Sequence, residues 1–122
     1  YIGFGGEGHQ VRDIIHINDV CRIILLQLKK INKINNLTFN IGGGFKNYTS
    51  LKNLTNKCVE LTGNKIFIKE DNRTSNYDIP YYITNNNKVF KTYGWRPTAN
   101  LDKTLKDIYS WLINNDMKDY FK

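Results

Sequence analysis

The chain has 122 residues, a length that fits one small domain with a modest hydrophobic core. Its composition, 40% hydrophobic and 24% charged, is that of an ordinary globular protein, and no apolar run is long enough to cross a membrane. The formal net charge of +7 suits an anionic ligand, but the lysines are scattered and form no basic run, so nucleic acid is not the expected partner.

The first part of the chain alternates between strand and helix patterns. Residues 1–4 can form the end of a strand, and residues 10–17 read as a strand rich in Val and Ile. Asn18 or Asp19 can then cap a helix that runs to about Lys30. This helix is apolar nearly all round, which predicts that it is covered on more than one side.

The middle of the chain repeats this alternation. Residues 37–41 predict a short apolar strand, ended by three glycines. Thr49 or Ser50 caps the next helix, whose apolar residues recur at spacings of three and four. Gly63 can end that helix in the left-handed conformation, and residues 65–69 predict another strand.

Two shorter helices close the chain. A polar loop over residues 70–80 precedes Thr84 or Asn85, either of which can cap a short helix that ends at Gly94. The last helix follows Asn100. Strands interleaved with about four helices predict an α/β chain, with too few strands for a closed barrel or a complete doubly wound sheet.

The two cysteines, Cys21 and Cys58, each fall on the apolar face of a predicted helix. This placement predicts two buried, reduced thiols. The chain has no Cys-x-x-Cys motif and no Cys/His cluster, so a metal site is not expected. A reducing cytoplasm fits this cysteine usage.

Arg12 and Arg73 are the candidate anion-binding residues. A guanidinium group offers a planar fork of donors that matches phosphate oxygens. Taken alone, Arg12 is better explained by a local ion pair with Asp13, which follows it in the chain. A diphosphate needs two or more such cations from different elements, and the two arginines meet that need together.

Three blocks of sequence, in this order and spacing, extend over nearly the whole chain. They are Gly8-His-Gln-Val-Arg-Asp-Ile-Ile-His-Ile-Asn-Asp-Val20, then Phe39-Asn-Ile-Gly-Gly-Gly44 with the helix start at Ser50, then Arg73-x4-Asp78-Ile-Pro80 with Gly94-Trp-Arg-Pro97. They resemble the C-terminal part of the extended short-chain dehydrogenase/reductases that act as nucleotide-sugar epimerases and dehydratases. Residues 1–6 and 61–66 resemble, within that family, the CDP-paratose (CDP-tyvelose) 2-epimerases.

The resemblance implies roles for matching positions. Arg12 and Arg73 correspond to the two arginines that contact the nucleotide diphosphate. Asp78 corresponds to the carboxylate near Arg73, which orients that arginine or the ribose. Gln10 stands where side chains of the substrate pocket leave the strand, and His16 begins a turn in which we expect structural hydrogen bonding at the helix cap.

The resemblance also implies that the fold is the C-terminal fragment of an extended Rossmann-type fold. Residues 1–122 would be a single substrate-binding portion, and NAD would be bound by an N-terminal domain that this chain lacks. Tyr48 and Lys52 have the spacing of the family's catalytic pair but span a helix start, and the glycines at 42–44 lack the Gly-x-Gly-x-x-Gly spacing of a dinucleotide site. We therefore expect no catalytic, cofactor-binding or metal-binding residue in this chain, and no epimerase activity from it alone.

The expected function is to bind a nucleotide-diphosphate sugar, with a CDP-sugar favoured, for an NAD-dependent epimerase of surface-polysaccharide sugar biosynthesis in the cytoplasm. In the family, residues 19–30 and 37–41 pack onto the cofactor domain. Alone they would leave an apolar patch exposed, so we expect homo-oligomers. A dehydratase or another epimerase of the same family remains an alternative, and so does a stand-alone basic module that binds nucleic acid.

Overall fold

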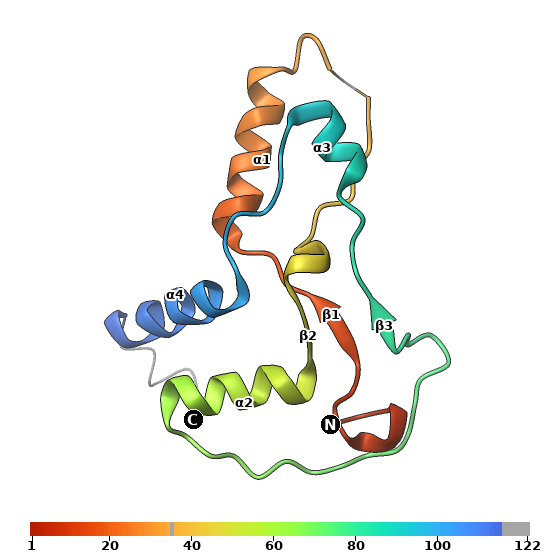
Figure 1. The fold of residues 1–122 in the computed structure, drawn as a ribbon, viewed down its shortest axis with the longest axis vertical. Coiled ribbons are helices and arrows are strands. Elements are labelled where there is room, and N and C mark those ends of the chain that lie inside the picture. The colour runs from red at the N-terminus through yellow and green to blue at the C-terminus, as the bar shows by residue number, and fades with distance from the viewer. Residues whose placement is uncertain (35, 116–122) are drawn as a thin grey trace.

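The computed structural model describes residues 1–34 and 36–115, which form four α-helices around a small three-stranded sheet (Figure 1). In chain order the elements are a 3-10 turn (Phe4–Gly6), β1 (Val11–Asp13), α1 (Ile17–Lys29), a 3-10 turn (Gly44–Lys46), β2 (Tyr48–Ser50), α2 (Leu51–Thr62), β3 (Tyr81–Tyr82), α3 (Asn87–Tyr93) and α4 (Leu101–Asn114). The prediction of an α/β chain with about four helices is confirmed.

β1 is the central strand of the sheet, in the order β2-β1-β3. It pairs antiparallel with β2, where Arg12 lies opposite Thr49, and parallel with β3, where Arg12 lies opposite Tyr82. Arg12 therefore projects from the middle of the sheet, where the flanking strands fix its backbone on both sides.

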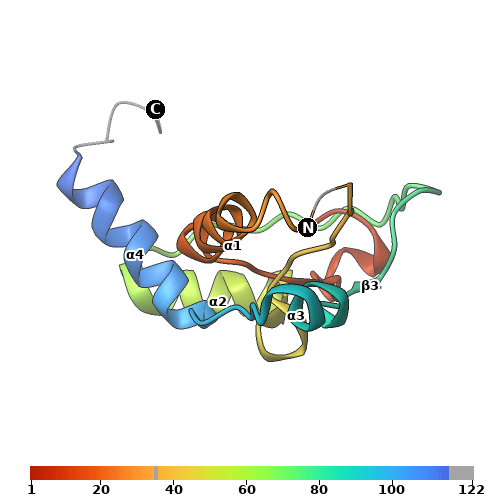
Figure 2. The same ribbon diagram turned by 90° about the horizontal axis from the view of Figure 1, so that it is seen from above.

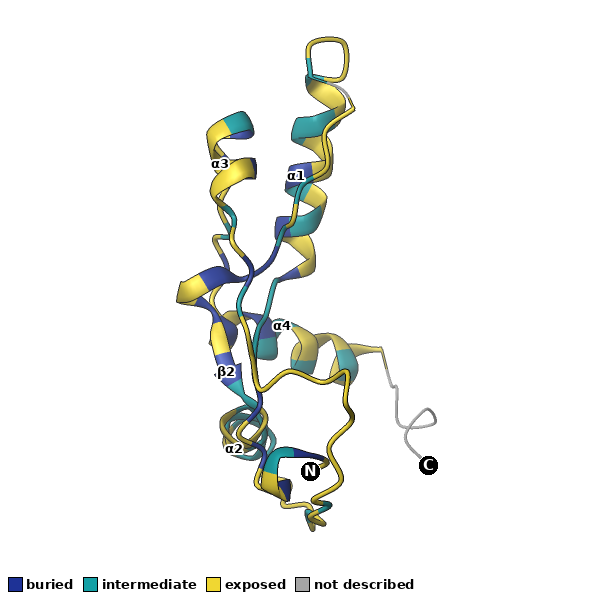
Figure 3. Ribbon diagram, turned by 90° about the vertical axis from the view of Figure 1, so that its right-hand side faces the viewer, coloured by how far each residue is buried: buried dark blue, intermediate teal, exposed yellow. Residues whose placement is uncertain are grey.

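The helices form two pairs, one at each end of the molecule. α1 packs beside α3 at one end of the molecule and α2 beside α4 at the other (Figure 1), and the view from above shows α1 on the opposite side of the sheet from α2 and α3 (Figure 2). The core lies between α1 and α3, where Ile23, Val89, Tyr93 and Trp95 are buried. Most residues are exposed or only partly buried, so the core is small (Figure 3).

The ends of α2 and α4 follow the predicted local signals. Ser50 Oγ accepts a hydrogen bond from Asn53 N at 3.1 Å, and Asn100 Oδ1 accepts one from Lys103 N at 2.8 Å. Gly63 ends α2 with φ 72°, a backbone conformation that costs glycine little. The predicted cap and left-handed stop of α2 are therefore confirmed, and so is the predicted start of α4 after Asn100.

The start of α1 was predicted two or three residues too late, and the start of α3 one or two residues too early. His16, not Asn18 or Asp19, caps α1, because its Nδ1 accepts a hydrogen bond from Asn18 N at 3.1 Å. The cap position of α3 is Asn86, one residue after Asn85, and its side-chain amide is bonded to Gly42 instead of to the helix. Asn85 Oδ1 nevertheless accepts a hydrogen bond from Asn87 N, the first residue of α3, at 2.9 Å.

The strands differ most from the prediction. Within residues 10–17 only Val11–Asp13 form a strand, and residues 1–4 contribute a single bridge, from Ile2 to Asp71. Residues 37–41 and 65–69 are irregular, because no strand in the described ranges lies beside them to complete their hydrogen bonding. The segment 37–41 instead packs by side chains, with the Phe39 ring edge-on to Tyr93 at 5.4 Å.

The outer face of α1 is uncovered. Ile24, Leu25 and Leu28 are each about half exposed, at 48%, 57% and 58%. Cys21 on the same helix is exposed and Cys58 is partly buried, so the prediction of two buried thiols is wrong. No helix among the described residues combines the length and the apolar character needed to cross a bilayer.

Candidate anion-binding site

Arg12 is paired with Asp78, 66 residues further along the chain. Its Nη2 donates to Asp78 Oδ1 at 2.7 Å and its Nη1 to the Val11 carbonyl at 2.8 Å. Both side chains are a little more than one-third exposed, at 38% and 35%. The guanidinium group has five N–H donors, so this arrangement fixes its position and leaves other donors for a ligand.

The local pair of Arg12 with Asp13 does not form. Asp13 Oδ2 instead accepts from Gly44 N at 2.8 Å, and its Oδ1 accepts from Thr84 Oγ1 at 3.2 Å. Adjacent residues of a strand point to opposite faces of the sheet, which separates the two side chains. Asp13 therefore ties the glycine turn to the segment before α3, while the Arg12 side chain pairs with Asp78.

Arg73 forms hydrogen bonds with Asp71, a residue that the sequence analysis did not consider. Its Nη2 lies 2.6 Å from Asp71 Oδ2 and its Nε 3.0 Å from Oδ1, and the Arg73 backbone N also donates to Oδ1 at 3.0 Å. The hydrogen bonds from the Arg73 side chain and backbone lower the pKa of Asp71 to about 2. The arginine remains 89% exposed, so the fork is oriented and open to solvent.

The carboxylate expected beside Arg73 thus lies beside Arg12. The structure brings Asp78 and Arg12 into contact, and it joins Arg73 to Asp71. Each arginine therefore has one carboxylate that holds it. The spacing Asp71-x-Arg73 was a usable signal, since an Asp side chain readily bonds the backbone two residues on.

Gln10 is buried, with 4% of its surface exposed. Its Nε2 donates to the Ile2 carbonyl and, at 3.5 Å, to the Gly3 carbonyl. Its Oε1 is buried and makes no hydrogen bond to the part of the chain that the structure describes. The side chain therefore contacts the N-terminal segment and does not line an open pocket.

The loop that bears Arg73 and Asp78 is attached at its start to the N-terminal segment and at its end to Val11, the residue before Arg12. At its start, Gly3 N donates to Asp71 O and Asp71 N donates to Tyr1 O, both at 2.8 Å. At its end, Val11 N donates to Pro80 O at 2.9 Å. The long segment from α2 to β3 passes beside the N-terminal segment (Figure 1), which brings the two predicted arginines onto one connected framework.

Tyrosines border the arginine on the sheet. Tyr82 lies opposite Arg12 in the register of β1 and β3, and it is 46% exposed. The rings of Tyr48 and Tyr81, each about half exposed, lie 6.3 Å apart. The sequence reasoning missed these rings as a group, because β2 and β3 were not predicted and only pairing with β1 brings them together.

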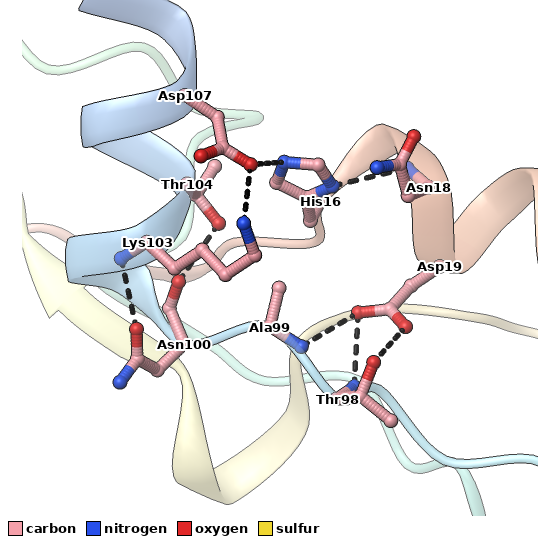
Figure 4. Close-up of polar contacts among 9 residues, drawn as sticks. All are labelled: His16, Asn18, Asp19, Thr98, Ala99, Asn100, Lys103, Thr104 and Asp107. Carbon is pink, nitrogen blue, oxygen red and sulfur yellow. Dashed lines mark hydrogen bonds and ion pairs between the residues drawn. The ribbon is translucent and has the colours of Figure 1, made fainter.

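A second polar cluster joins the first and third sequence blocks (Figure 4). Asp19 is 2% exposed and accepts from Thr98 N, Thr98 Oγ1 and Ala99 N at 2.8–3.1 Å, while Arg22 donates to it at 2.6 Å. Burial alone would raise the pKa of Asp19, but the hydrogen bonds from Arg22, Ala99 and Thr98 outweigh it and lower the pKa to about 2.

His16 completes this cluster. It is 5% exposed, and its Nε2 lies 3.1 Å from Asp107 Oδ2 on α4. Its other ring nitrogen caps α1, so the expectation of structural hydrogen bonding at this residue is confirmed. The cluster therefore joins the start of α1 to α4 and to the segment that precedes it.

The glycines at 42–44 do not fit a dinucleotide phosphate. A Cβ on Gly43 would collide with the Ile14 carbonyl, and one on Gly42 with the Thr84 side chain. These glycines allow close packing of the protein backbone, not the approach of a ligand. Tyr48 lies on β2 and Lys52 in the first turn of α2. The glycine turn at 42–44 is therefore not a dinucleotide-binding turn.

Two surface hollows lie away from the arginines. One, of about 310 Å³, lies between α2 and α4 and includes Lys57 and Asp102. The other, of about 290 Å³, includes Phe45, Phe90 and Arg96. Neither is lined by Gln10, Arg12, Arg73 or Asp78.

The chain is similar to proteins of known function, although no family model matches it. It is 26% identical over 111 residues to a CDP-paratose 2-epimerase from Salmonella typhi, and 28% identical over 116 residues to a putative UDP-glucose 4-epimerase from Methanocaldococcus jannaschii. These matches cover 87% and 91% of this chain. They cover 31% and 34% of the relatives, so the chain spans about a third of their length.

Solved structures agree. A UDP-glucose 4-epimerase from Thermotoga maritima, solved with UDP-glucose, has a TM-score of 0.76 and 29% identity, covering 93% of this chain and 35% of that one. A dTDP-glucose 4,6-dehydratase from Bacillus anthracis, solved with NAD, has a TM-score of 0.70 and 24% identity, covering 91% and 34%. The chain resembles the nucleotide-sugar epimerases and dehydratases. Its fold is a C-terminal fragment of their Rossmann-type fold, and the predicted resemblance is confirmed.

Proposed function

We propose that these residues form the nucleotide-diphosphate-sugar-binding part of an NAD-dependent nucleotide-sugar epimerase. The observation that supports this most is the pair of arginines, Arg12 and Arg73, each held by a carboxylate on one connected framework. The chain also matches epimerases and dehydratases along most of its length.

Arg12 and Arg73 would bind the diphosphate through charge-assisted hydrogen bonds. Asp78 limits the rotation of Arg12, and Asp71 limits that of Arg73, so less side-chain entropy is lost on binding. The net charge of +7 adds an attractive field for an anionic substrate. In this role the chain binds and orients, and it does not itself exchange hydride.

NAD, when bound, supplies the oxidation and reduction of the sugar carbon in such an enzyme. The glycine turn at 42–44 is packed against Ile14 and Thr84 and does not fit this cofactor. We therefore assign both NAD binding and the catalytic pair to polypeptide outside this chain, and we expect that the 122-residue chain alone epimerises no sugar.

The favoured substrate is a CDP-sugar, and the favoured activity is that of a CDP-paratose 2-epimerase. The CDP-paratose 2-epimerase match supports it, but the UDP-glucose 4-epimerase matches have similar identity. Another epimerase or a dehydratase of the same family is the alternative. The full-length protein is this chain joined to the proposed cofactor-binding part. Calorimetric titration of the full-length protein with CDP and with UDP shows which base it binds more tightly. The product formed from the preferred nucleotide sugar then identifies the reaction.

The binding role is tested with Arg12→Ala and Arg73→Ala in the full-length protein. Each loss of a charge-assisted contact should weaken nucleoside-diphosphate binding roughly ten- to hundredfold. Lys33→Ala removes one exposed positive charge elsewhere and should leave the affinity nearly unchanged. Equal effects of all three substitutions, with steep salt dependence of nucleic-acid binding, would support a basic nucleic-acid module instead.

A further inference from the structure

Gln10 has an unusual position for a residue two places from a candidate ligand-binding arginine. Its side chain is almost fully buried, and its amide nitrogen donates to the carbonyls of Ile2 and Gly3. Its buried Oε1 makes no hydrogen bond to the described residues, and burying an unpartnered acceptor is unfavourable. An apolar side chain would avoid that cost, so the N–H donor explains why an amide stands here.

The segment held by Gln10 is the one that positions Arg73. Ile2 bridges Asp71 in parallel register, and Gly3 N donates to Asp71 O. The Asp71 carboxylate in turn binds the Arg73 guanidinium through two of its nitrogens. A short path of contacts therefore leads from the strand of Arg12, through Gln10, to the second arginine.

Gly3 lies directly between the two ends of this path. A Cβ on Gly3 would lie 3.4 Å from Gln10 Nε2, 3.5 Å from Thr74 Oγ1 and 3.6 Å from the Arg73 carbonyl. The next residue, Phe4, donates from its backbone N to Thr74 Oγ1 at 2.8 Å. Gln10 thus contacts a piece of backbone that touches the Arg73 loop at Asp71 and again at Thr74.

We propose that Gln10 is a positioning residue for Arg73, acting through the segment Tyr1–Phe4, so that it sets where the second arginine lies relative to Arg12. This inference rests on the proposed function, because it assumes that both arginines bind one diphosphate. It assigns Gln10 no contact with the ligand. The predicted place of Gln10 at the substrate is thereby replaced by an indirect role.

A double-mutant cycle in the full-length protein, with CDP and UDP as titrants, tests this role. Gln10→Leu should weaken binding about tenfold, as expected when a charged contact is misplaced. In Arg73→Ala the same Gln10→Leu change should have almost no further effect, since its action passes through Arg73. In Arg12→Ala its effect should multiply with that of the arginine. General destabilisation would not single out Arg73 in this way.

Thr74→Val provides a second variant in case Gln10→Leu does not fold. It removes the acceptor of Phe4 N while keeping the shape of the side chain, and it should weaken binding severalfold. Thr55→Val is the matched control, because Thr55 Oγ1 bonds only within α2, to Leu51 O at 2.9 Å. Faster amide exchange at Gly3 and Asp71 in the Gln10 variant would show the loosened path directly.

The outcomes separate the two proposals. Wild-type affinity in folded Gln10→Leu, or an effect that multiplies fully with Arg73→Ala, overturns the positioning role and leaves the binding site intact. Wild-type affinity in both Arg12→Ala and Arg73→Ala overturns the proposed function, and the positioning role with it.

Discussion

Asp19 and Thr98 are joined by two hydrogen bonds across 79 residues of sequence, from Thr98 N to Oδ2 at 2.9 Å and from Thr98 Oγ1 to Oδ1 at 2.8 Å (Figure 4). Ala99 N and Arg22 supply further donors. A nearly fully buried carboxylate is tolerated here because its lone pairs are satisfied. The contact fixes the first turn of α1 against the segment that leads into α4.

Replacing this carboxylate should therefore cost much stability. In Asp19→Asn the new amide N–H₂ would face a donor, and the charge that pairs with Arg22 would be lost. We expect the free energy of unfolding of the 122-residue chain to fall by roughly 2–4 kcal/mol, measured by urea denaturation. Asp102→Asn is the control, because its partner Lys57 is a surface lysine and Asp102 is 59% exposed. A change below 1 kcal/mol in Asp19→Asn would contradict this account.

The same residue predicts a pH dependence. The pKa of Asp19 is about 2 in the folded chain against 3.8 as its ordinary value, so the folded state binds the proton less tightly than the unfolded state. Its contribution, roughly 2 kcal/mol, is fully present above pH 4 and is lost as the pH falls toward 2. Denaturation midpoints between pH 5 and pH 2 should decline less steeply in Asp19→Asn than in the unmodified chain. Parallel declines would show that other carboxylates dominate.

The sequence predicts those features of this fold that depend on neighbouring residues. Ser50 and Asn100 cap their helices, and Gly63 ends α2, because a cap needs only a side chain within one helical turn. The start of α1 was predicted too late. His16 serves as its cap while Asp107, from α4, binds the other side of the ring, and no local pattern reveals that partner.

The strands and the ion pairs depend on distant partners and were predicted less well. Tyr81–Tyr82 becomes a strand only because Arg12 and its neighbours lie beside it. The residues 37–41 look more like a strand, yet they have no strand partner in the described ranges. Likewise both arginines were found from sequence, but the carboxylate assigned to Arg73 belongs to Arg12.

Cys21 should report whether α1 is covered. It is exposed in this structure, whereas Cys58 is partly buried in α2. In the 122-residue chain we expect a water-soluble thiol reagent to modify Cys21 first, with the labelled site identified by peptide mass. Cys21→Ser should remove the fast phase, and Cys58→Ser should leave it. In the full-length protein we expect slower labelling of Cys21, because the proposed cofactor-binding part would cover this helix. Equal rates in the two proteins would contradict that cover.

The apolar face of α1 should make the 122-residue chain self-associate. Leu25 and Leu28 are each more than half exposed on one helix, and such a patch favours association when nothing covers it. Sedimentation velocity should show dimers or larger species whose fraction rises with concentration. The double variant Leu25→Glu/Leu28→Glu should sediment as a monomer, because charges in the contact would have to be desolvated. Ile113→Glu, on the equally exposed position of α4, is the matched control and should still associate. A clean monomer of the unmodified chain at high concentration would show that the exposed face of α1 does not drive association.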